Sequence, residues 1–264
     1  MKIMEKYNLT VLFEFGSETG LEYLYRIDQK GIKISSIICV GDEYSEKRKE
    51  LLKLRTGGLF KRRRFSDFLE NKNIPIYIIK DVNSENCSNL LESLKPDLVV
   101  FEGSKIIRNK IYTIPKYGML NVHLGILPYL RGCSCMEWSI LKNYPIGLTC
   151  HYLIGSVDAG AIINRFQLKI NKSDSYFILR AKLLHLSAYS VATAVQDIIQ
   201  KGFRIENAYL QEKGPWFSPL KDLDLIAKMK EMIEYGDYKP QSIKDNIPLT
   251  TVDVNLENLQ ITEL

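Results

Sequence analysis

Residues 74–101, IPIYIIKDVNSENCSNLLESLKPDLVVF, place one helical segment between two short apolar runs. The runs at 74–79 and 98–101 are apolar and contain several β-branched residues, which is typical of strands in a parallel sheet. Between them, residues 85–94 predict a helix, and Pro96 ends it. A strand, a helix and a second strand in this order predict a βαβ unit, and therefore an α/β fold with a mostly parallel sheet.

The same alternation continues on both sides of this unit. Gly31 is expected to end a first helix whose Leu21, Leu24 and Tyr25 share one face. A long helix further along is expected to start at Ser173-Asp174 and to stop at Gly202. The remaining predicted strands lie at 9–13, 34–40, 119–123, 147–153 and 161–170, and the predicted helices at 17–30, 133–143 and 173–201.

Two segments interrupt the alternation. Residues 41–73 are charged and contain the basic run Lys61-Arg62-Arg63-Arg64, and they are too long for a tight connection. We expect a helical insertion there, or a mobile loop over the site. After Tyr209 the chain is rich in turns, with one amphipathic helix predicted at 220–233 and a polar tail from Asp237. The predicted domains are therefore a main domain over 1–210 and a short C-terminal extension over 211–264.

Composition places the chain among ordinary globular proteins, because 45% of its 264 residues are hydrophobic and 25% are charged. The net charge of +5 is largely local, since the basic run alone carries four positive charges. The apolar runs are far shorter than the roughly 20 residues of a membrane-spanning helix, and the N-terminus lacks an apolar signal core. We expect a cytoplasmic protein whose five cysteines stay reduced, because none of them forms a CxxC pair.

The densest chemical signal lies on the predicted strand 119–123 and in the residues that follow it. Asn121 and His123 are two positions apart, so they project from the same side of the strand, near the end at which open parallel sheets bind ligands. A carboxamide can stabilise a developing oxyanion and an imidazole can move protons near pH 7, which are the two needs of acyl transfer. Asp158, from a later loop, could hold the imidazole's charge or order a water. Taken alone, an Asn-x-His pattern favours a structural pair over a catalytic one.

The surrounding residues add a longer ordered pattern. After Asn121 and His123 come Leu-Pro, an aromatic residue, Arg-Gly, a Trp, Gly-x-Thr-x-His and Asp-x-Gly-x-Ile-Ile, ending at Ile163. This stretch resembles the formyltransferases that use 10-formyltetrahydrofolate, which include glycinamide ribonucleotide, methionyl-tRNA and nucleotide-sugar N-formyltransferases. The resemblance implies a Rossmann-like domain over about residues 8–205. The chain departs from the family pattern at Leu124-Gly125, where Pro-Ser is usual, and at Ala159, where Thr is usual.

The resemblance also implies residue roles. Asn121 would hydrogen-bond the formyl oxygen, His123 would stabilise its charge and assist proton transfer, and Asp158 would position a water or accept the amine's proton. The cosubstrate, 10-formyltetrahydrofolate, would lie beside the loop between Leu98 and Ile107. The implied cofactor-binding residues are Leu98, Val99, Phe101, Gly103, Ile107, Leu127 and Asp158, and the implied substrate-binding residues are Ser17, Arg131, Gly132 and Trp138.

Other polar residues can be interpreted as parts of a binding site or as structural residues. The turn from Gly16 to Gly20 could bind a phosphate at a helix N-terminus or could be a plain βα turn. The basic run 61–64 could attract a phosphorylated ligand or the folate tail, or could be a solvated face. His151 has a supporting role beside the site or a structural one, and His185 is interpreted as a packed or surface helix residue. Cys133-x-Cys135 has no second ligand pair, so we expect packing there and no metal.

The predicted acceptor is a small-molecule amine, and we expect an amino sugar linked to a nucleotide (a dTDP- or UDP-4-amino-sugar), as in surface polysaccharide biosynthesis. This choice follows by elimination. Residues 211–264 lack the features of the tRNA-binding barrel of methionyl-tRNA formyltransferases, and the turn at 16–20 matches the phosphate turn of glycinamide ribonucleotide formyltransferases only loosely. Neither a nucleic-acid partner nor a membrane is expected, and a homodimer is possible. The alternatives are a glycinamide ribonucleotide or methionyl-tRNA formyltransferase, a formyltetrahydrofolate hydrolase, and an inactive folate- or nucleotide-binding protein.

Overall fold

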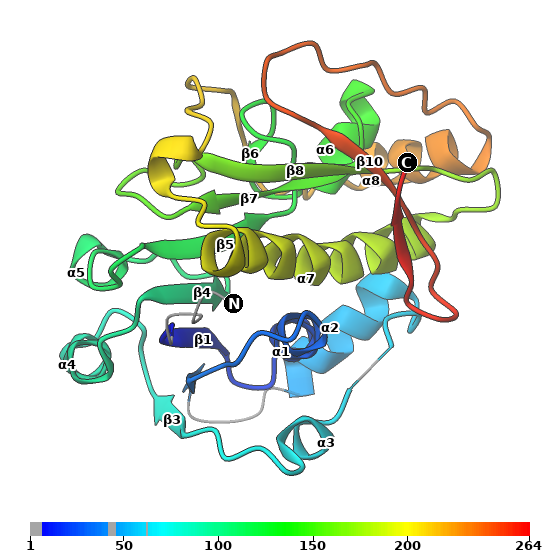
Figure 1. Ribbon diagram of the computed structural model, residues 1–264. Helices are drawn as coiled ribbons and strands as arrows, with labels where there is room; N and C mark the ends of the chain where they lie inside the picture. The colour runs from blue at the N-terminus through cyan, green and yellow to red at the C-terminus, as the bar shows by residue number, and fades with distance from the viewer. Residues whose placement is uncertain (1–6, 42–45, 62) are drawn as a thin grey trace.

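A computed structural model describes residues 7–41, 46–61 and 63–264, and it contains one large twisted sheet (Figure 1). Nine strands pair in the order β11-β10-β8-β7-β5-β4-β1-β2-β3. The pairs among β1, β2, β3, β4 and β5 and the β8–β10 pair are parallel, whereas β5–β7, β7–β8 and β10–β11 are antiparallel. This confirms the predicted α/β fold with a mostly parallel sheet. The strands are β1 (Leu9–Glu14), β2 (Ser36–Val40), β3 (Ile76–Ile79), β4 (Leu98–Glu102), β5 (Met119–His123), β7 (Gly147–Tyr152), β8 (Ile162–Leu168), β10 (Thr250–Val254) and β11 (Ile261–Glu263).

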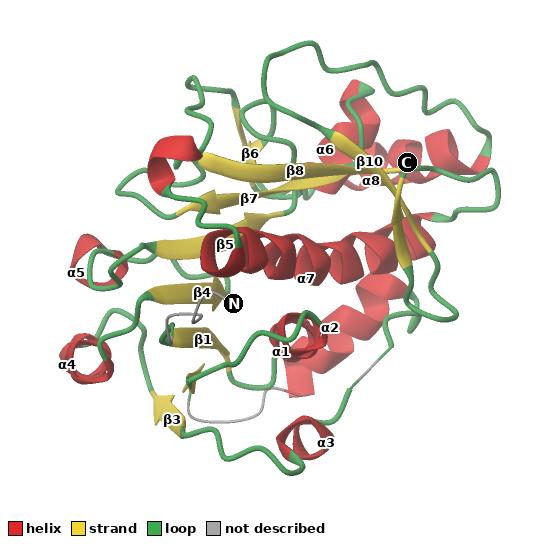
Figure 2. Cartoon of the chain, in the orientation of Figure 1, coloured by secondary structure: helices red, strands yellow, loops and turns green. Residues whose placement is uncertain are grey.

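Helices cover both faces of the sheet (Figure 2). One face packs on α1 and α7 through a large apolar cluster, and the other packs on α4 and α5 through a smaller one. The helices are α1 (Glu18–Gln29), α2 (Glu46–Thr56), α3 (Phe65–Leu69), α4 (Glu85–Leu94), α5 (Asn109–Tyr112), α6 (Cys135–Lys142), α7 (Tyr176–Gln200) and α8 (Leu223–Glu234). A separate two-stranded ladder joins β6 (Arg131–Gly132) to β9 (Trp216–Phe217).

The start of α7 differs from the prediction. Ser175, not Ser173-Asp174, is the N-cap, and its hydroxyl accepts a hydrogen bond from the amide of Ile178. Asp174 is instead 7% exposed, and its carboxylate lies 2.8 Å from the Lys182 ammonium and accepts the Asn171 amide. Asp174 therefore pairs with the buried Lys182 ammonium and does not cap the helix.

The two irregular segments of the sequence both contain regular structure. The insertion forms α2 and α3, and α2 packs against α7. The tail after Asp237 contains β10 and β11, which extend the sheet beyond β8. In β10 the buried Val252 and Val254 alternate with partly exposed neighbours, so a period of two was present in a stretch that we expected to be a polar tail.

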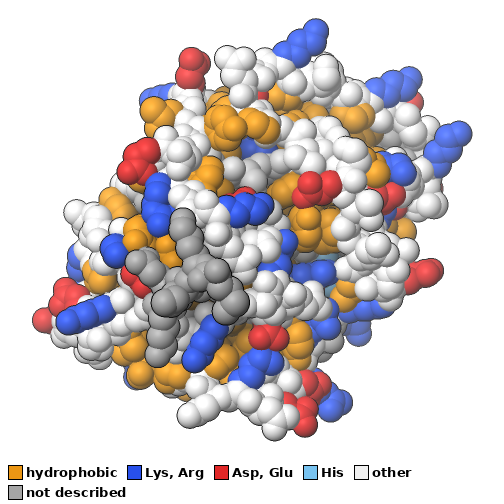
Figure 3. Space-filling view, viewed as in Figure 1, with side chains coloured by type: hydrophobic (Ala, Val, Ile, Leu, Met, Phe, Trp, Pro, Cys, Tyr) orange, Lys and Arg blue, Asp and Glu red, His pale blue; other side chains and the backbone are white. Residues whose placement is uncertain are grey.

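No helix of the described ranges combines the length and the apolar character needed to cross a bilayer. On the face that Figure 3 shows, Lys and Arg side chains are interspersed with Asp and Glu side chains rather than gathered into one block.

Candidate active site

Strand β5 and the loop before β8 bring the three predicted catalytic residues to one place. Asn121 and His123 lie on the same side of β5, and Asn121 is the cross-strand partner of His151 on β7. The loop after β7 folds back so that Asp158 Oδ1 lies 3.3 Å from His123 Nδ1. Asp158 has φ +51, and its Oδ2 accepts a hydrogen bond of 3.0 Å from the Gly132 amide. The carboxylate is therefore held from two sides.

The neighbours of His123 define which of its ring nitrogens can exchange a proton. Nε2 lies 2.7 Å from the Leu130 carbonyl oxygen, which can only accept, so Nε2 carries a hydrogen and donates it. The Cys135 thiol packs beside the same nitrogen, with Sγ 3.3 Å away. Nδ1, which faces Asp158, is then the ring atom that can take up and release a proton.

Asn121 differs from its neighbours because its side chain is only partly buried. Within the described ranges, its carboxamide has no hydrogen-bond partner. A carboxamide offers two N–H donors and one oxygen acceptor. These groups are therefore available to a bound molecule, beside an imidazole and a carboxylate.

His151 is the second histidine at this site and is almost fully buried. Its Nδ1 lies 2.9 Å from the Tyr152 carbonyl oxygen, to which it donates, and its Nε2 faces Asp158 Oδ1 at 3.9 Å. Burial lowers the pKa of His151 to about 4, with the nearby Asp158 acting in the opposite direction. His151 is therefore neutral at pH 7, and its Nε2 is a buried acceptor that finds no hydrogen-bond partner among the described residues.

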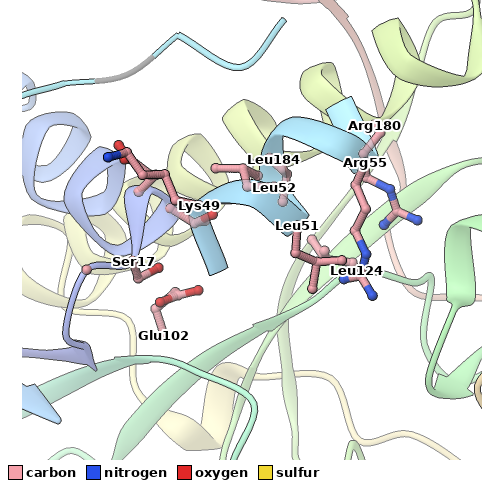
Figure 4. A pocket seen from close by; sticks show the side chains of 12 residues that line it. Ser17, Lys49, Leu51, Leu52, Arg55, Glu102, Leu124, Arg180 and Leu184 are labelled. Atoms are coloured by element: carbon pink, nitrogen blue, oxygen red, sulfur yellow. The ribbon is translucent and has the colours of Figure 1, made fainter. Parts of the chain in front are cut away.

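A cavity of about 180 Å³ opens at the carboxyl ends of β1, β4 and β5 (Figure 4). Ser17 and Glu102 lie at one end of it, Arg55 and Arg180 at the other, and Leu124, the residue after His123, lies at its edge. Among these residues, sequence analysis proposed only Ser17 as a substrate-binding residue, as part of a possible phosphate turn. Ser17 is also the N-cap of α1 and accepts the Gly20 amide. Arg55 and Arg180 come from helices whose proximity depends on the docking of α2 against α7, so no local pattern could reveal them.

Of the four predicted substrate-binding residues, Arg131 and Gly132 contact the Asp158 loop, Trp138 contacts the C-terminal segment, and Ser17 lines the cavity described above. The Arg131 guanidinium donates to the Val157 carbonyl and approaches the Ser156 hydroxyl at 3.5 Å. The Trp138 indole donates to the Ser218 carbonyl at 2.9 Å, and its ring packs 5.3 Å from that of Phe217. The Arg131 backbone amide also donates to the Pro215 carbonyl, so both residues contact the C-terminal segment.

Most of the predicted folate-binding residues lie in the core. Leu98 packs in the cluster beneath α1 and α7, whereas Val99, Phe101 and Ile107 pack in the cluster beneath α4 and α5. Leu127 is fully buried, and its amide donates to the Thr149 hydroxyl at 3.0 Å. Gly103 follows β4, where an added Cβ would lie 2.7 Å from the Phe101 ring. The open part of this loop is residues 103–106, in which Ile106 is 69% exposed.

The basic run makes internal contacts. Lys61 donates to the Glu257 carbonyl, and Arg63 Nε lies 2.8 Å from a carboxylate oxygen of the fully buried Glu22. His185 of α7 faces the same carboxylate at 3.4 Å. Burial raises the pKa of Glu22, but hydrogen bonds from His185 and Arg63 outweigh it and lower the pKa to about 2. Arg62 lies outside the described residues.

Among the residues that the structure describes, no group of three or more His, Cys, Asp or Glu side chains could hold a metal ion.

A family model described as formyl transferase matches residues 33–195, which is more than half of the chain. Among curated proteins, the methionyl-tRNA formyltransferase of Bacillus velezensis is 33% identical over 132 residues, which are 49% of this chain and 42% of the relative. The chain spans about half, or less than half, of the length of the curated relatives that it matches.

Solved structures share the fold. A phosphoribosylglycinamide formyltransferase from Anaplasma phagocytophilum has a TM-score of 0.58 at 21% identity and covers 80% of this chain and 99% of its own. A 4-N formyltransferase from Francisella tularensis has a TM-score of 0.57 at 19% identity and covers 97% of this chain and 96% of its own. At these identities the likeness is one of fold, and in the second case it extends through most of residues 211–264.

Proposed function

Because the chain belongs to the formyl transferase family, we propose that it transfers the formyl group of 10-formyltetrahydrofolate to the primary amine of a nucleotide-linked amino sugar. The observation that carries the chemical part of this proposal is the cluster of Asn121, His123 and Asp158, in which Nδ1 and Oδ1 are 3.3 Å apart. The cluster offers an oxyanion donor and a proton-transfer pair, while the attacking nitrogen comes from the acceptor.

In the proposed reaction, the acceptor amine attacks the formyl carbon and the formyl oxygen becomes an oxyanion. The free Asn121 carboxamide donates a hydrogen bond to that oxygen. His123 keeps its Nε2 hydrogen on the Leu130 carbonyl, so the proton lost by the amine passes to Nδ1 or to the Asp158 carboxylate. When the bond from carbon to the folate nitrogen breaks, the same pair returns a proton to that nitrogen.

We place the formyl donor beside the loop after β4, as the resemblance to the family implies. The partly exposed residues 103–106, with the apolar Ile106 side chain, suit contact with the flat face of the cosubstrate's pteridine ring. The buried Leu98, Val99, Phe101 and Leu127 would shape the strand and loop beneath it. Gly103 would let the folate ring approach the backbone, because any larger residue there would meet Phe101.

The choice of a sugar nucleotide rests on the C-terminal segment. The full-length likeness to the 4-N formyltransferase, and to a sugar N-formyltransferase from Shewanella that covers 97% of this chain, includes this segment. The phosphoribosylglycinamide formyltransferase structure covers only 80% of the chain. Here residues 211–219 pack directly on Arg131, Gly132 and Trp138 beside the Asp158 loop.

The test is a comparison of acceptors with purified protein. Tetrahydrofolate release would be followed by absorbance with dTDP- and UDP-linked 4-amino-sugars, with glycinamide ribonucleotide, with methionyl-tRNA, and without an acceptor. We expect release that depends on a sugar nucleotide, and a formamide product by mass spectrometry. Release without any acceptor would identify a hydrolase, and release only with methionyl-tRNA or glycinamide ribonucleotide would replace the proposed acceptor.

A further inference from the structure

A second hollow is lined by residues on either side of Asp158 and shares no lining residue with the cavity at the carboxyl ends of β1, β4 and β5. It has a volume of about 650 Å³, within the range of roughly 300–1,000 Å³ that is usual for small-molecule sites. One wall is Arg131 with residues 156, 157 and 159, and the other is the segment 211–214 with Trp216. The hollow is therefore built jointly by the central domain and the C-terminal segment.

Two buried polar atoms in the walls lack partners among the described residues. Arg131 is only 7% exposed, and although its guanidinium donates to the Val157 carbonyl, its Nε has no hydrogen-bond acceptor. Gln211 donates from Nε2 to the Gly160 carbonyl at 2.7 Å, but its Oε1 has no donor. Buried polar atoms in folded proteins usually have a partner, so a polar molecule bound in the hollow could supply an acceptor to Arg131 Nε and a donor to Gln211 Oε1.

Trp216 supplies a flat apolar surface to the same hollow. It is 54% exposed, which is unusual for so large an aromatic side chain, although β9 pairs with β6 beneath it. The ring packs over Gly132, where an added Cβ would lie 3.0 Å from the ring. The indole is therefore fixed against the protein on one side and open on the other, which suits stacking by a planar ring.

The charged neighbours fit the rest of a nucleotide. Glu212 and Lys213 follow Gln211, and both side chains are exposed in the wall of the hollow. A carboxylate accepts hydrogen bonds from ribose hydroxyls, and an ammonium pairs with phosphate. A ring stacked on Trp216 can therefore have its sugar and phosphates on the adjoining residues.

The walls of the hollow also contact the loop that carries Asp158. Arg131 donates to the carbonyl of Val157, and the next residue, Gly132, donates its amide to Asp158 Oδ2. Val157 and Ala159, on either side of the catalytic carboxylate, line the hollow. A ligand anchored here would thus lie against the loop that holds Asp158.

We propose that this hollow binds the nucleobase of the acceptor, stacked on Trp216, with the edge of the base recognised beside Arg131 and Gln211. The inference rests on the proposed function, because it takes the acceptor to be a nucleotide. The pteridine of folate is also a flat ring with polar edges. The position of Glu212 and Lys213 favours the nucleobase, since a ribose and a phosphate group need such partners.

The test measures binding of UDP and dTDP alone, without sugar or folate, by isothermal titration calorimetry. We expect wild-type protein to bind one of them, Trp216→Ala to weaken binding about tenfold or more, and Trp216→Phe to restore part of the loss, because base stacking on an aromatic ring has about this strength. Tyr235→Ala, which removes another exposed aromatic ring just after the end of α8, is the matched control and should bind normally.

Gln211→Leu tests the same site without removing the indole that packs on Gly132. It should also weaken nucleotide binding while the thermal unfolding temperature stays near that of the wild type. In a parallel arm, 5-formyltetrahydrofolate affinity should not change in any of these variants. Loss of folate affinity with intact nucleotide affinity would assign the hollow to the pteridine and overturn the proposal, and so would unchanged nucleotide binding in both Trp216→Ala and Gln211→Leu.

The outcomes separate this inference from the proposed function. Nucleotide binding that depends on Trp216, together with no formylation of any sugar nucleotide, would leave the base site in place and reject the acceptor chemistry. Formylation of a sugar nucleotide with the same KM in wild type and Trp216→Ala would support the reaction and reject the base site.

Discussion

At the scale of single residues, the site depends on what each polar atom already contacts. His123 Nε2 donates to the Leu130 carbonyl, and Asp158 Oδ2 accepts from the Gly132 amide. The Asn121 carboxamide has no hydrogen-bond partner within the described ranges. Only the unoccupied atoms can act on a substrate. The sequence motif identified the residue types, but the assignment of Nδ1 as the exchanging nitrogen required the Leu130 carbonyl, which a pattern of letters does not contain.

Replacement of Asn121 tests the oxyanion role. Asn121→Ala should lower kcat by about 10² to 10³, the usual effect of removing one oxyanion donor, and should leave folate affinity nearly unchanged. Steady-state kinetics and a folate titration on the same preparation measure both. A rise in KM at constant kcat would instead assign Asn121 to ground-state binding.

The buried His151 predicts a pH dependence of stability. Its pKa is lowered from 6.5 to about 4 in the folded protein, so below pH 6.5 the unfolded chain binds the proton and stability falls as the pH drops toward 4. Between pH 7 and pH 5.5 this residue should cost about 1 kcal/mol of unfolding free energy.

Urea unfolding of wild type and His151→Gln at the two pH values isolates the effect. The loss on acidification should be about 1 kcal/mol smaller in the variant, because glutamine does not titrate. Equal losses in both proteins would show that His151 does not carry this dependence.

At the scale of elements, the strands and main helices were predictable because their apolar residues recur with the period of the element. The boundaries were less certain where a charge partner competed, as at the start of α7. Asp174 has the features of a helix-start residue, but the Lys182 ammonium, two turns along the helix, draws it into a buried ion pair. Local sequence does not specify which of the neighbouring Ser and Asp residues becomes the cap.

The two serines before α7 give a matched pair of variants. Ser175→Ala should destabilise the protein by about 1 kcal/mol because the Ile178 amide loses its acceptor. Ser173→Ala should change the unfolding free energy by less than about 0.5 kcal/mol, as surface substitutions usually do. Equilibrium urea unfolding compares them, and a larger effect at Ser173 would place the cap where the sequence first suggested.

At the scale of the whole molecule, the C-terminal segment is joined to the sheet rather than appended to it. Arg165 on β8 is almost fully buried, and its guanidinium contacts the Leu127 carbonyl and both carboxylate oxygens of Asp245. The same segment supplies β10 to the sheet edge and β9 beside Gly132. These long-range pairings lie outside any local motif, which is why the sequence predicted turns around β9 and a polar tail where β10 forms.

The buried ion pair of Arg165 and Asp245 predicts how much the C-terminal segment contributes to the free energy of unfolding. Asp245→Ala should cost roughly 3 kcal/mol, because it leaves the buried Arg165 guanidinium without its carboxylate. Asp253→Ala breaks an exposed pair with Lys169 and should cost less than about 1 kcal/mol. Thermal or urea unfolding measures both, and equal costs would mean that Arg165 finds another partner or water when Asp245 is absent.

The most direct test of the central claim is the rate at which the protein converts a nucleotide-linked amino sugar and 10-formyltetrahydrofolate into the formamide, measured for wild type and His123→Ala. We expect turnover by the wild type and a fall in kcat of at least about 10² in the variant, because in the proposed reaction His123 and Asp158 would carry the proton that the amine must lose. Formamide formation by His123→Ala at the wild-type rate would contradict the account.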